Sequence, residues 1–141
     1  MNPIFHIAFP VTDIPQAKQF YGQKLGCGIG RENDKSVIFN LQGHQLVAHI
    51  DPDPSAPQSG IYPRHFGLVF PLEQAFDAFL QGLQMRQVEF YVSPKRRFEG
   101  SLLEHRTFFL SDPFHNLMEF KYYRNAEVIF GAVDHHQVGE T

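Results

Sequence analysis

Residues 6–11 read His6-Ile7-Ala8-Phe9-Pro10-Val11, and residues 65–70 repeat the pattern as His65-Phe66-Gly67-Leu68-Val69-Phe70. In each stretch apolar side chains recur at alternate positions, as in a β-strand with one buried face. A run of apolar residues at helical spacing follows each stretch: Ile14, Ala17, Phe20, Tyr21 and Leu25 after the first, and Leu72, Phe76, Phe79, Leu80 and Leu83 after the second. The chain therefore contains one structural unit twice.

Shorter apolar runs complete both units. They predict strands at 27–32, 36–41 and 46–50 in the first half and at 88–92, 106–110 and 116–122 in the second. We therefore expect one α+β domain of two βαβββ modules. Module 1 covers about residues 4–51, a proline-rich linker 52–61, module 2 about 62–124 and a tail 125–141, which is expected to be loose from Asp134.

Composition narrows the class of protein. A chain of 141 residues with 43% hydrophobic content is long enough for one buried core. The net charge of -3 gives no field that would recruit nucleic acid or an anionic membrane, and no apolar stretch approaches the length of a membrane span. The single cysteine, Cys27, excludes an internal disulfide framework and has no paired base that would make it a nucleophile. With no export signal visible, we expect a cytoplasmic protein whose partners are small molecules.

Three residues of metal-ligand type lie in apolar, strand-like stretches. His6 and His65 occupy equivalent places in the repeat, and Glu119 lies between Met118 and Phe120. A lone strand histidine is most often an ordinary core or surface residue, but a repeated pair is hard to explain by packing, and a buried carboxylate needs a cation or water. Aligning residues 46–50 with 116–120 places His49 at the position equivalent to Glu119 in the repeat. His49 could be a fourth ligand or a residue that lines the cavity.

Other side chains carry weaker signals. The run 95–97 is by default a solvated loop, and its functional alternative is a clamp in which Arg96 and Arg97 hold a substrate carboxylate. His105 and His115 precede Glu119 closely enough to serve as acid or base, although surface positions are the default for both. Two further candidates for a substrate contact, which could equally be core residues, are Tyr62 and Tyr122.

From about residue 4 to residue 123 the chain resembles the vicinal oxygen chelate superfamily, which includes glyoxalase I, extradiol ring-cleaving dioxygenases and bleomycin-resistance proteins. The resemblance rests on residues 6–11 leading into Phe20-Tyr21 and Leu25-Gly26, on His65-Phe66-Gly67, and on residues 112–120. The last stretch is similar to the family's Asp-Pro-x-Gly-Asn-x-x-Glu-Phe ending, with His115 in place of the glycine.

The resemblance implies an open, cup-shaped mixed β-sheet barrel with helices outside, built around a divalent metal. In it His6, His65 and Glu119 match ligand positions and His49 matches the fourth. Two imidazoles and one carboxylate favour Fe(II), with Zn, Ni or Mn as alternatives. Relatives often pair, so we expect a homodimer, and the site lies either within one chain or between subunits.

An extradiol dioxygenase acting on adjacent oxygens is the first reading of the reaction. The extradiol signature is incomplete, however, because Phe108-Phe109 stands where a hydrophobic-Tyr pair is usual and no histidine lies at residues 100–102. His105 or His115 would have to supply the acid or base. A glyoxalase I-like isomerase or lyase, with Glu119 as base, is the alternative, and a bleomycin-resistance-type binding protein without catalysis is the third.

Overall fold

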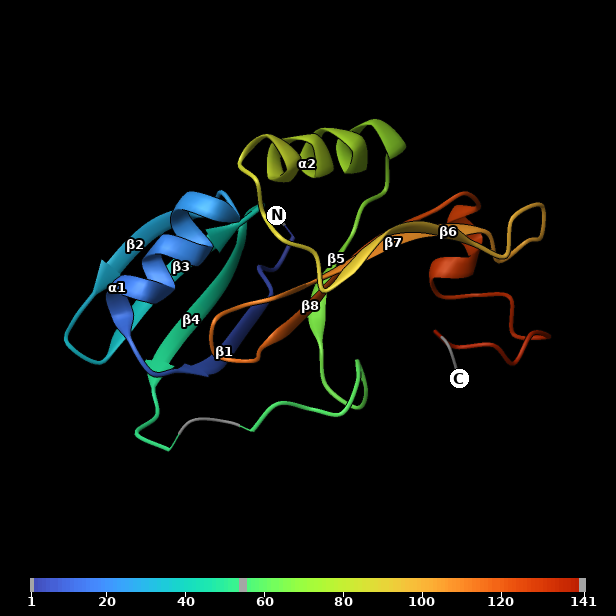
Figure 1. Ribbon diagram of the computed structural model, residues 1–141. Coiled ribbons are helices and arrows are strands. Elements are labelled where there is room, and N and C mark those ends of the chain that lie inside the picture. Colours follow the sequence, from blue (N-terminus) through green and yellow to red (C-terminus); the bar gives the residue numbers. More distant parts are fainter. Residues whose placement is uncertain (1, 54–55, 140–141) are drawn as a thin grey trace.

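The computed structural model describes residues 2–53 and 56–139. Positions 54–55 of the predicted linker and 140–141 of the predicted tail lie outside the described residues. The two βαβββ modules are confirmed (Figure 1). Module 1 comprises β1 (His6–Val11), α1 (Ile14–Ala17), the π-helical η1 (Lys18–Lys24), β2 (Gly28–Glu32), β3 (Ser36–Leu41) and β4 (His44–Ile50). Module 2 comprises β5 (Phe66–Val69), α2 (Glu73–Met85), β6 (Val92–Arg97), β7 (His105–Ser111) and β8 (Leu117–Tyr123), and the 3-10 helix η2 (Ala126–Ile129) follows.

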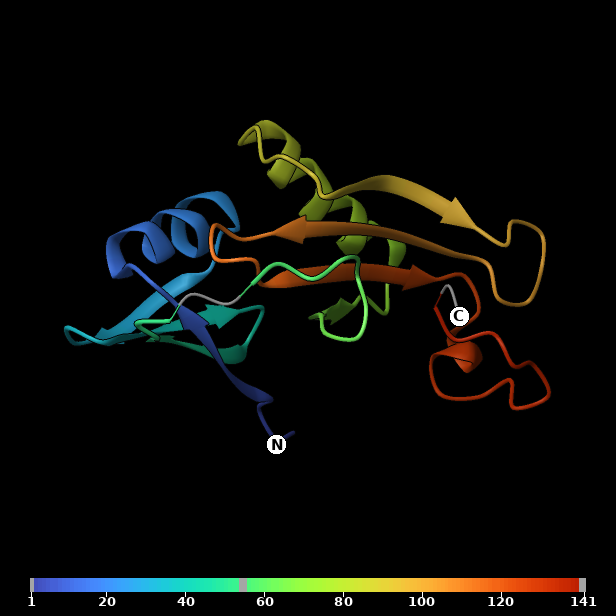
Figure 2. The ribbon, with the colours of Figure 1, turned by 60° about the horizontal axis from the view of Figure 1, so that its bottom comes forward.

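Each module forms a four-stranded mixed sheet. The strand orders are β1-β4-β3-β2 and β5-β8-β7-β6, so the same topology occurs twice. The first strand of each module pairs in parallel with the last, and the remaining pairs are antiparallel. The sheets stay open and do not close into a barrel, and helices cover one face of each (Figures 1 and 2).

Local sequence explains the helices. The side chain of Asp13 accepts a hydrogen bond of 2.7 Å from the backbone N–H of Gln16, which caps α1, and Pro15 occupies the first turn. The helix then continues without a break into η1, where the N–H of Leu25 reaches the carbonyl of Phe20 at 2.8 Å. The single predicted helix is thus confirmed, although its π-type second half was not predicted. In α2 the buried face carries Phe76, Leu80 and Leu83.

The two modules share one core. The rings of Phe9 and Phe66 lie 5.6 Å apart across the junction. The buried hydroxyl of Tyr21 donates to Asp112 at 2.6 Å, and the Asn116 amide donates to the carbonyl of Pro10 at 2.8 Å. These contacts fix the position of module 2, which carries His65 and Glu119, against module 1.

The predicted position of one strand is wrong. The strand expected at 88–92 begins only at Val92 and runs through the basic residues to Arg97, which had been assigned to a loop. These residues pair with β7, with a register shift between Val92 and Lys95. The guanidinium of Arg96 lies 2.6 Å from the carboxylate of Glu104, so its charge is matched on the strand rather than left in solvent.

The tail has little regular structure after η2, as expected, but it is docked against module 2. The carbonyl of Gly139 accepts a hydrogen bond of 3.3 Å from Arg97. None of the helices in the described part of the chain is both long enough and apolar enough to cross a membrane.

Candidate metal centre

The close pairing of β5 and β8 places His65 beside Glu119. Gly67 lies opposite Glu119 in the parallel register, and a Cβ at position 67 would fall 1.7 Å from the carbonyl oxygen of Glu119. Only glycine therefore allows the two strands to approach so closely here. The residue that starts this stretch, His65, then reaches the carboxylate from the neighbouring strand.

His65 and Glu119 form a half-buried pair. The Nε2 atom of His65 lies 3.1 Å from Oε1 of Glu119, while its Nδ1 donates to the carbonyl of Ile61 at 2.8 Å. A backbone acceptor on one ring nitrogen is the usual way in which proteins orient a metal-ligating histidine, because it leaves the other nitrogen for the ion. Phe109 packs edge-on against this ring at 5.2 Å.

The second oxygen of Glu119 is held separately. Thr107, from β7, donates its hydroxyl to Oε2 at 2.5 Å, and the ammonium of Lys121 lies 3.8 Å from the same atom. Oε1 is thereby left facing His65. Sequence reasoning missed Thr107, and its signal was the alternation in β7 that puts it on the same face as Glu119.

The pair is electrostatically coupled. The hydrogen bond with Glu119 raises the pKa of His65 more than burial lowers it. Burial alone would raise the pKa of Glu119, but the hydrogen bonds from His65 and Thr107 and the charge of Lys121 outweigh it and lower that pKa. Nε2 of His65 and Oε1 of Glu119, which lie 3.1 Å apart, are atoms of the type that a divalent metal binds.

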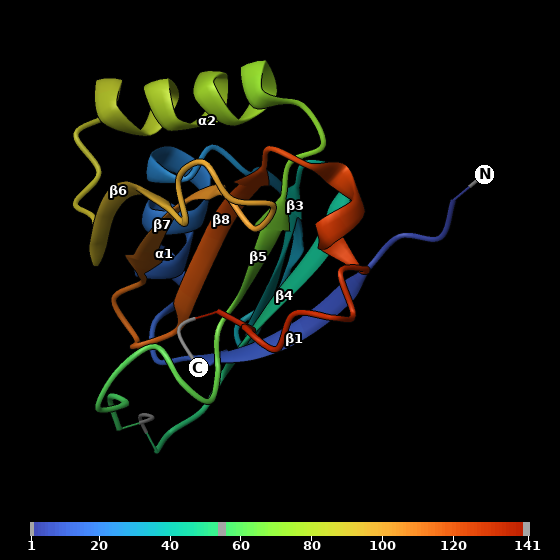
Figure 3. The ribbon, with the colours of Figure 1, turned by 90° about the vertical axis from the view of Figure 1, so that its right-hand side faces the viewer.

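The third predicted ligand lies elsewhere. His6, at the exposed start of β1, donates from Nδ1 to the side-chain oxygen of Gln45 at 2.7 Å, just as Nδ1 of His65 donates to a carbonyl oxygen. The N-terminal end next to it projects from the molecule (Figure 3). Within the described residues, no three His, Cys, Asp or Glu side chains come close enough to hold one ion together.

The register also separates His49 from the predicted fourth position. Glu119 is paired with Gly67, two residues after His65, whereas His49 is paired with Pro10, four residues after His6. The residue equivalent to Glu119 is therefore Val47, which pairs with Ala8. The alignment that matched His49 with Glu119 is shifted by two residues, about 7 Å along the strand.

The remaining candidates divide between the two faces of the module 2 sheet. Tyr122 pairs with Arg106 on the face toward α2, opposite to Glu119, and Arg96 is engaged by Glu104. His105 and Arg97 pair across β6 and β7 on the face that carries Glu119.

Tyr62 and His115 lie near His65. The ring of Tyr62 lies 5.9 Å from that of His65. His115 helps to line a cavity of about 390 Å³ that also includes His65 and the β1 residues Ala8 and Pro10. It has a φ of 70°, in the left-handed region that suits the glycine of the family pattern, so a histidine here is strained.

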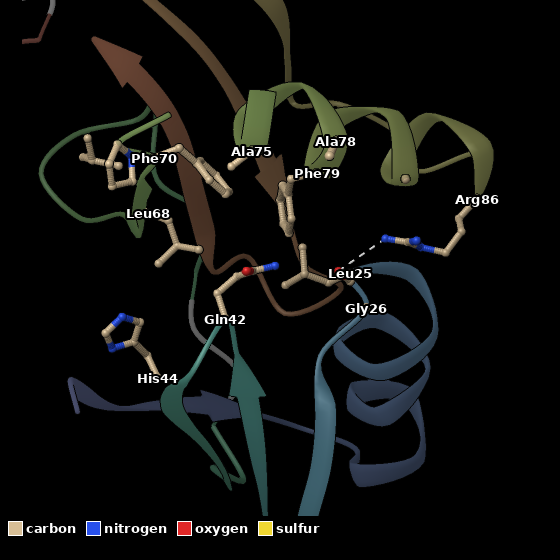
Figure 4. Close-up of a pocket in the computed structure, with 13 residues that line it drawn as sticks. Leu25, Gly26, Gln42, His44, Leu68, Phe70, Ala75, Ala78, Phe79 and Arg86 are labelled. Carbon is tan, nitrogen blue, oxygen red and sulfur yellow. Dashed lines mark hydrogen bonds between the residues drawn. The ribbon is translucent and has the colours of Figure 1, made fainter. Parts of the chain in front are cut away.

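A separate hollow of about 710 Å³ lies between α2 and module 1 (Figure 4). Its walls are mainly apolar, with Leu68 and Phe79 facing Leu25, and Arg86 closes one end through a hydrogen bond of 2.7 Å to the carbonyl of Lys24. None of the predicted metal ligands lines it. Cys27 offers no alternative chemistry, because burial raises the pKa of its thiol to about 12.

Comparisons with known proteins agree with this architecture. The family model described as "Glyoxalase/Bleomycin resistance protein/Dioxygenase superfamily" matches residues 4–120. A crystal structure of a glyoxalase/bleomycin resistance protein/dioxygenase from Alicyclobacillus acidocaldarius is 40% identical, with a TM-score of 0.85, covering 92% of this chain and 97% of that one. A comparison with curated proteins gives no match.

More distant structures share the fold alone. The fosfomycin resistance protein FosX from Listeria monocytogenes is 16% identical with a TM-score of 0.63, covering 86% of this chain and 93% of that one. Lactoylglutathione lyase from Agrobacterium tumefaciens is 17% identical with a TM-score of 0.62, covering 86% and 94%. By its family model and its 40% identical relative, the chain belongs to the glyoxalase/bleomycin resistance protein/dioxygenase superfamily, the vicinal oxygen chelate proteins.

Proposed function

We propose that the protein is a metal-dependent enzyme that binds a small substrate through two adjacent oxygens. The observation that carries the proposal is the pairing of Nε2 of His65 with Oε1 of Glu119 at 3.1 Å. Each side chain is oriented by a second hydrogen bond: His65 donates to the carbonyl of Ile61, and Glu119 accepts from the hydroxyl of Thr107. Such support is what a metal site requires of the residues around its ligands.

We further propose that the third ligand is His6 of a second copy of the chain, in a homodimer. In its own chain His6 is exposed, and its Nδ1 is engaged by Gln45 in the same way as the Nδ1 of His65 is engaged by a carbonyl. A symmetric dimer that joins module 1 of one subunit to module 2 of the other would create two equivalent sites, each with two imidazoles and one carboxylate. The homodimer expected from the sequence then becomes a requirement of the site.

Three protein ligands leave coordination positions for a substrate. A bound divalent metal would stabilise negative charge on the substrate's two oxygens. Because Val47 takes the place at which a fourth ligand would be expected, the donor set is the two-histidine, one-carboxylate type that suits Fe(II) and O2. Extradiol ring cleavage is therefore the first candidate reaction, with Fe(II) as the favoured metal.

The chain's own residues would position the substrate and move protons. The rings of Phe109 and Tyr62 flank His65. His115 lines the same cavity as His65 and is a candidate for the proton carrier. His105 is buried on the same face as Glu119, and because burial lowers its pKa it is a neutral base at pH 7.

Glyoxalase-like isomerisation is the second candidate. It is favoured by Oε1 of Glu119, which faces His65 while Oε2 is held by Thr107, so that the carboxylate could take a proton from a substrate carbon. In that case Zn or Ni would be the expected metal.

The test starts with the metal content of protein purified without added metal. We expect close to one ion per chain, and Glu119→Ala should remove it while the protein stays folded. O2 consumption with catechols would then support the dioxygenase, and turnover of a hemithioacetal without O2 uptake would support the isomerase. Near-normal metal content in the Glu119→Ala protein would contradict the assignment, and a wild-type protein that holds no metal would favour a non-catalytic binding protein.

A further inference from the structure

The C-terminal segment, residues 126–139, covers the outer end of module 2. It lies on the sheet face opposite α2, next to the β6–β7 loop and away from module 1 (Figures 1 and 2). Between this segment and the sheet is a cavity of about 270 Å³. The sheet side of its wall includes His105, Lys121 and Tyr123, which share their face with Glu119.

The segment also reaches toward the metal pair. A Cβ at Gly139 would lie 2.4 Å from the hydroxyl of Tyr62, whose ring is next to His65. Arg97 holds Gly139 through the carbonyl, and its guanidinium stacks on Phe98 at 4.8 Å. Lys121, which lines the cavity and lies 3.8 Å from Glu119, thus connects the cavity to the metal pair.

Lys121 is the charge that links the two parts. Its side chain is only 14% exposed, its ammonium lies 3.8 Å from Oε2 of Glu119, and it rests 4.9 Å from the centre of the Tyr123 ring. Glu119 is its counter-ion. A divalent metal on Glu119 would draw on the same carboxylate charge, and a largely buried ammonium would then need another anion.

The net charge of the proposed site shows why Lys121 would need another anion. With neutral histidines, one carboxylate, one divalent ion and one lysine, the proposed site has a net charge of about +2. Two oxygens of a chelating substrate can neutralise part of it, and a further anionic group beside Lys121 would neutralise the rest. Along β8, Lys121 lies two positions after Glu119 on the same face, so that group would bind on the Lys121 side of the proposed metal site.

We infer that the substrate carries an anionic oxyacid group, a carboxylate, phosphonate or phosphate, which binds Lys121 in the cavity under residues 126–139 while its adjacent oxygens face His65 and Glu119. This assignment rests on the proposed metal site. It makes Lys121 a residue that determines specificity, and it makes the C-terminal segment a wall of the substrate pocket.

Two chelating probes that differ in one charge test the assignment. Catechol and 3,4-dihydroxybenzoate present the same pair of oxygens, and only the second has a carboxylate on the far side of its ring. Their affinities for the metal-loaded, full-length protein can be compared by calorimetry in the absence of O2. We expect the carboxylated probe to bind about tenfold or more tightly than catechol, because a charge-assisted contact with Lys121 is added.

Substitution of the lysine should remove this preference. In Lys121→Met the two probes should bind with nearly equal affinity, and Lys121→Arg should keep most of the preference. Lys35→Met, which removes a lysine from the turn before β3, is the matched control and should behave as wild type. Thermal unfolding of each variant identifies any that does not fold, and Lys121→Arg keeps the test valid if Lys121→Met fails.

The possible failures are distinct. If the protein holds metal and binds catechol but does not prefer the carboxylated probe, or if Lys121→Met keeps the preference, the anion site is wrong and the metal site stands. If neither the metal nor either probe binds, the proposed function is wrong, and the inference falls with it because Lys121 would keep Glu119 as its partner.

Discussion

The hydroxyl of Tyr21, in module 1, donates a hydrogen bond of 2.6 Å to Oδ2 of Asp112, in module 2. Both groups are buried, and the other oxygen of Asp112 accepts from the backbone N–H groups of Phe114 and Asn116 at 2.8 Å. Asp112 thus organises the turn before β8 and joins it to module 1. The position of Glu119 depends on this turn because β8 follows directly from it.

Replacing Tyr21 with Phe should therefore destabilise the whole protein. The substitution removes one of the two hydrogen bonds to Oδ2 of Asp112, the other being donated by the side-chain amide of Asn116 at 2.8 Å. A hydrogen bond to a carboxylate contributes about 1.5–3 kcal/mol to the unfolding free energy. Urea denaturation measures the change. Tyr122→Phe, at a half-buried position on the helix-facing side of β8, is the control and should change stability less. Equal effects of the two substitutions would show that the Tyr21–Asp112 bond has no special role.

Position 67 should tolerate no side chain. Gly67→Ala would push a methyl group into the carbonyl of Glu119, so the β5–β8 pairing must open. We expect a loss of more than about 2 kcal/mol in unfolding free energy, together with weaker metal binding. Gly60→Ala, where nothing lies within 4 Å of the added Cβ, should be nearly neutral. A stable Gly67→Ala protein with normal metal content would mean that the two strands are not held this closely.

His115 is predicted to lower the stability of the protein while contributing to its function. Its φ of 70° is costly for a residue with a Cβ, so His115→Gly should raise the unfolding free energy by about 0.5–1 kcal/mol. If the imidazole carries a proton in the reaction, kcat should fall in the same variant while metal content stays normal. A gain in stability with unchanged kcat would remove His115 from the candidate catalytic residues.

The metal-free protein should show a pH-dependent contribution from the metal pair. The raised pKa of His65 gives stability that is complete below the ordinary value of 6.5 and is lost as the pH rises through the raised pKa. The lowered pKa of Glu119 gives stability that is present above 4.5 and is lost as the pH falls through the lowered pKa.

The difference in unfolding free energy between metal-stripped wild type and His65→Gln should therefore be largest between about pH 4.5 and 6.5 and should shrink at alkaline pH. Urea titrations across this range measure it. A difference that stays constant into the alkaline range would show that no charged pair forms between His65 and Glu119.

The repeat made the fold predictable from sequence. Residues 6–11 and 65–70 predicted the first strand of each module, and Asp13 as an N-cap predicted the start of the first helix. The prediction of a loop at 95–97 was wrong because a basic run is typical of a solvated loop. Its acidic partner, Glu104, can be recognised only in the structure, where it lies beside Arg96.

The site was less predictable. Spacing identified His65 and Glu119 as ligand types, but the two-residue offset that puts Val47 in place of His49 depends on strand register, which the pattern of apolar residues did not reveal. Thr107 was recognised as a neighbour of Glu119 only from the pairing of β7 with β8. Sequence also carries no information on whether His6 meets the pair within one chain or across two.

In the proposed dimer, one ion is bound by His6 of one subunit and by His65 and Glu119 of the other. Mixing two variants that should each be inactive, His6→Ala and His65→Ala, through co-expression or joint refolding tests this shared site. Neither variant alone has an intact site, but a mixed dimer has one, so random pairing should restore about one quarter of the wild-type activity and tightly bound metal. A mixture that stays as inactive and metal-poor as its two parents, although mixed dimers are present, would contradict the shared site.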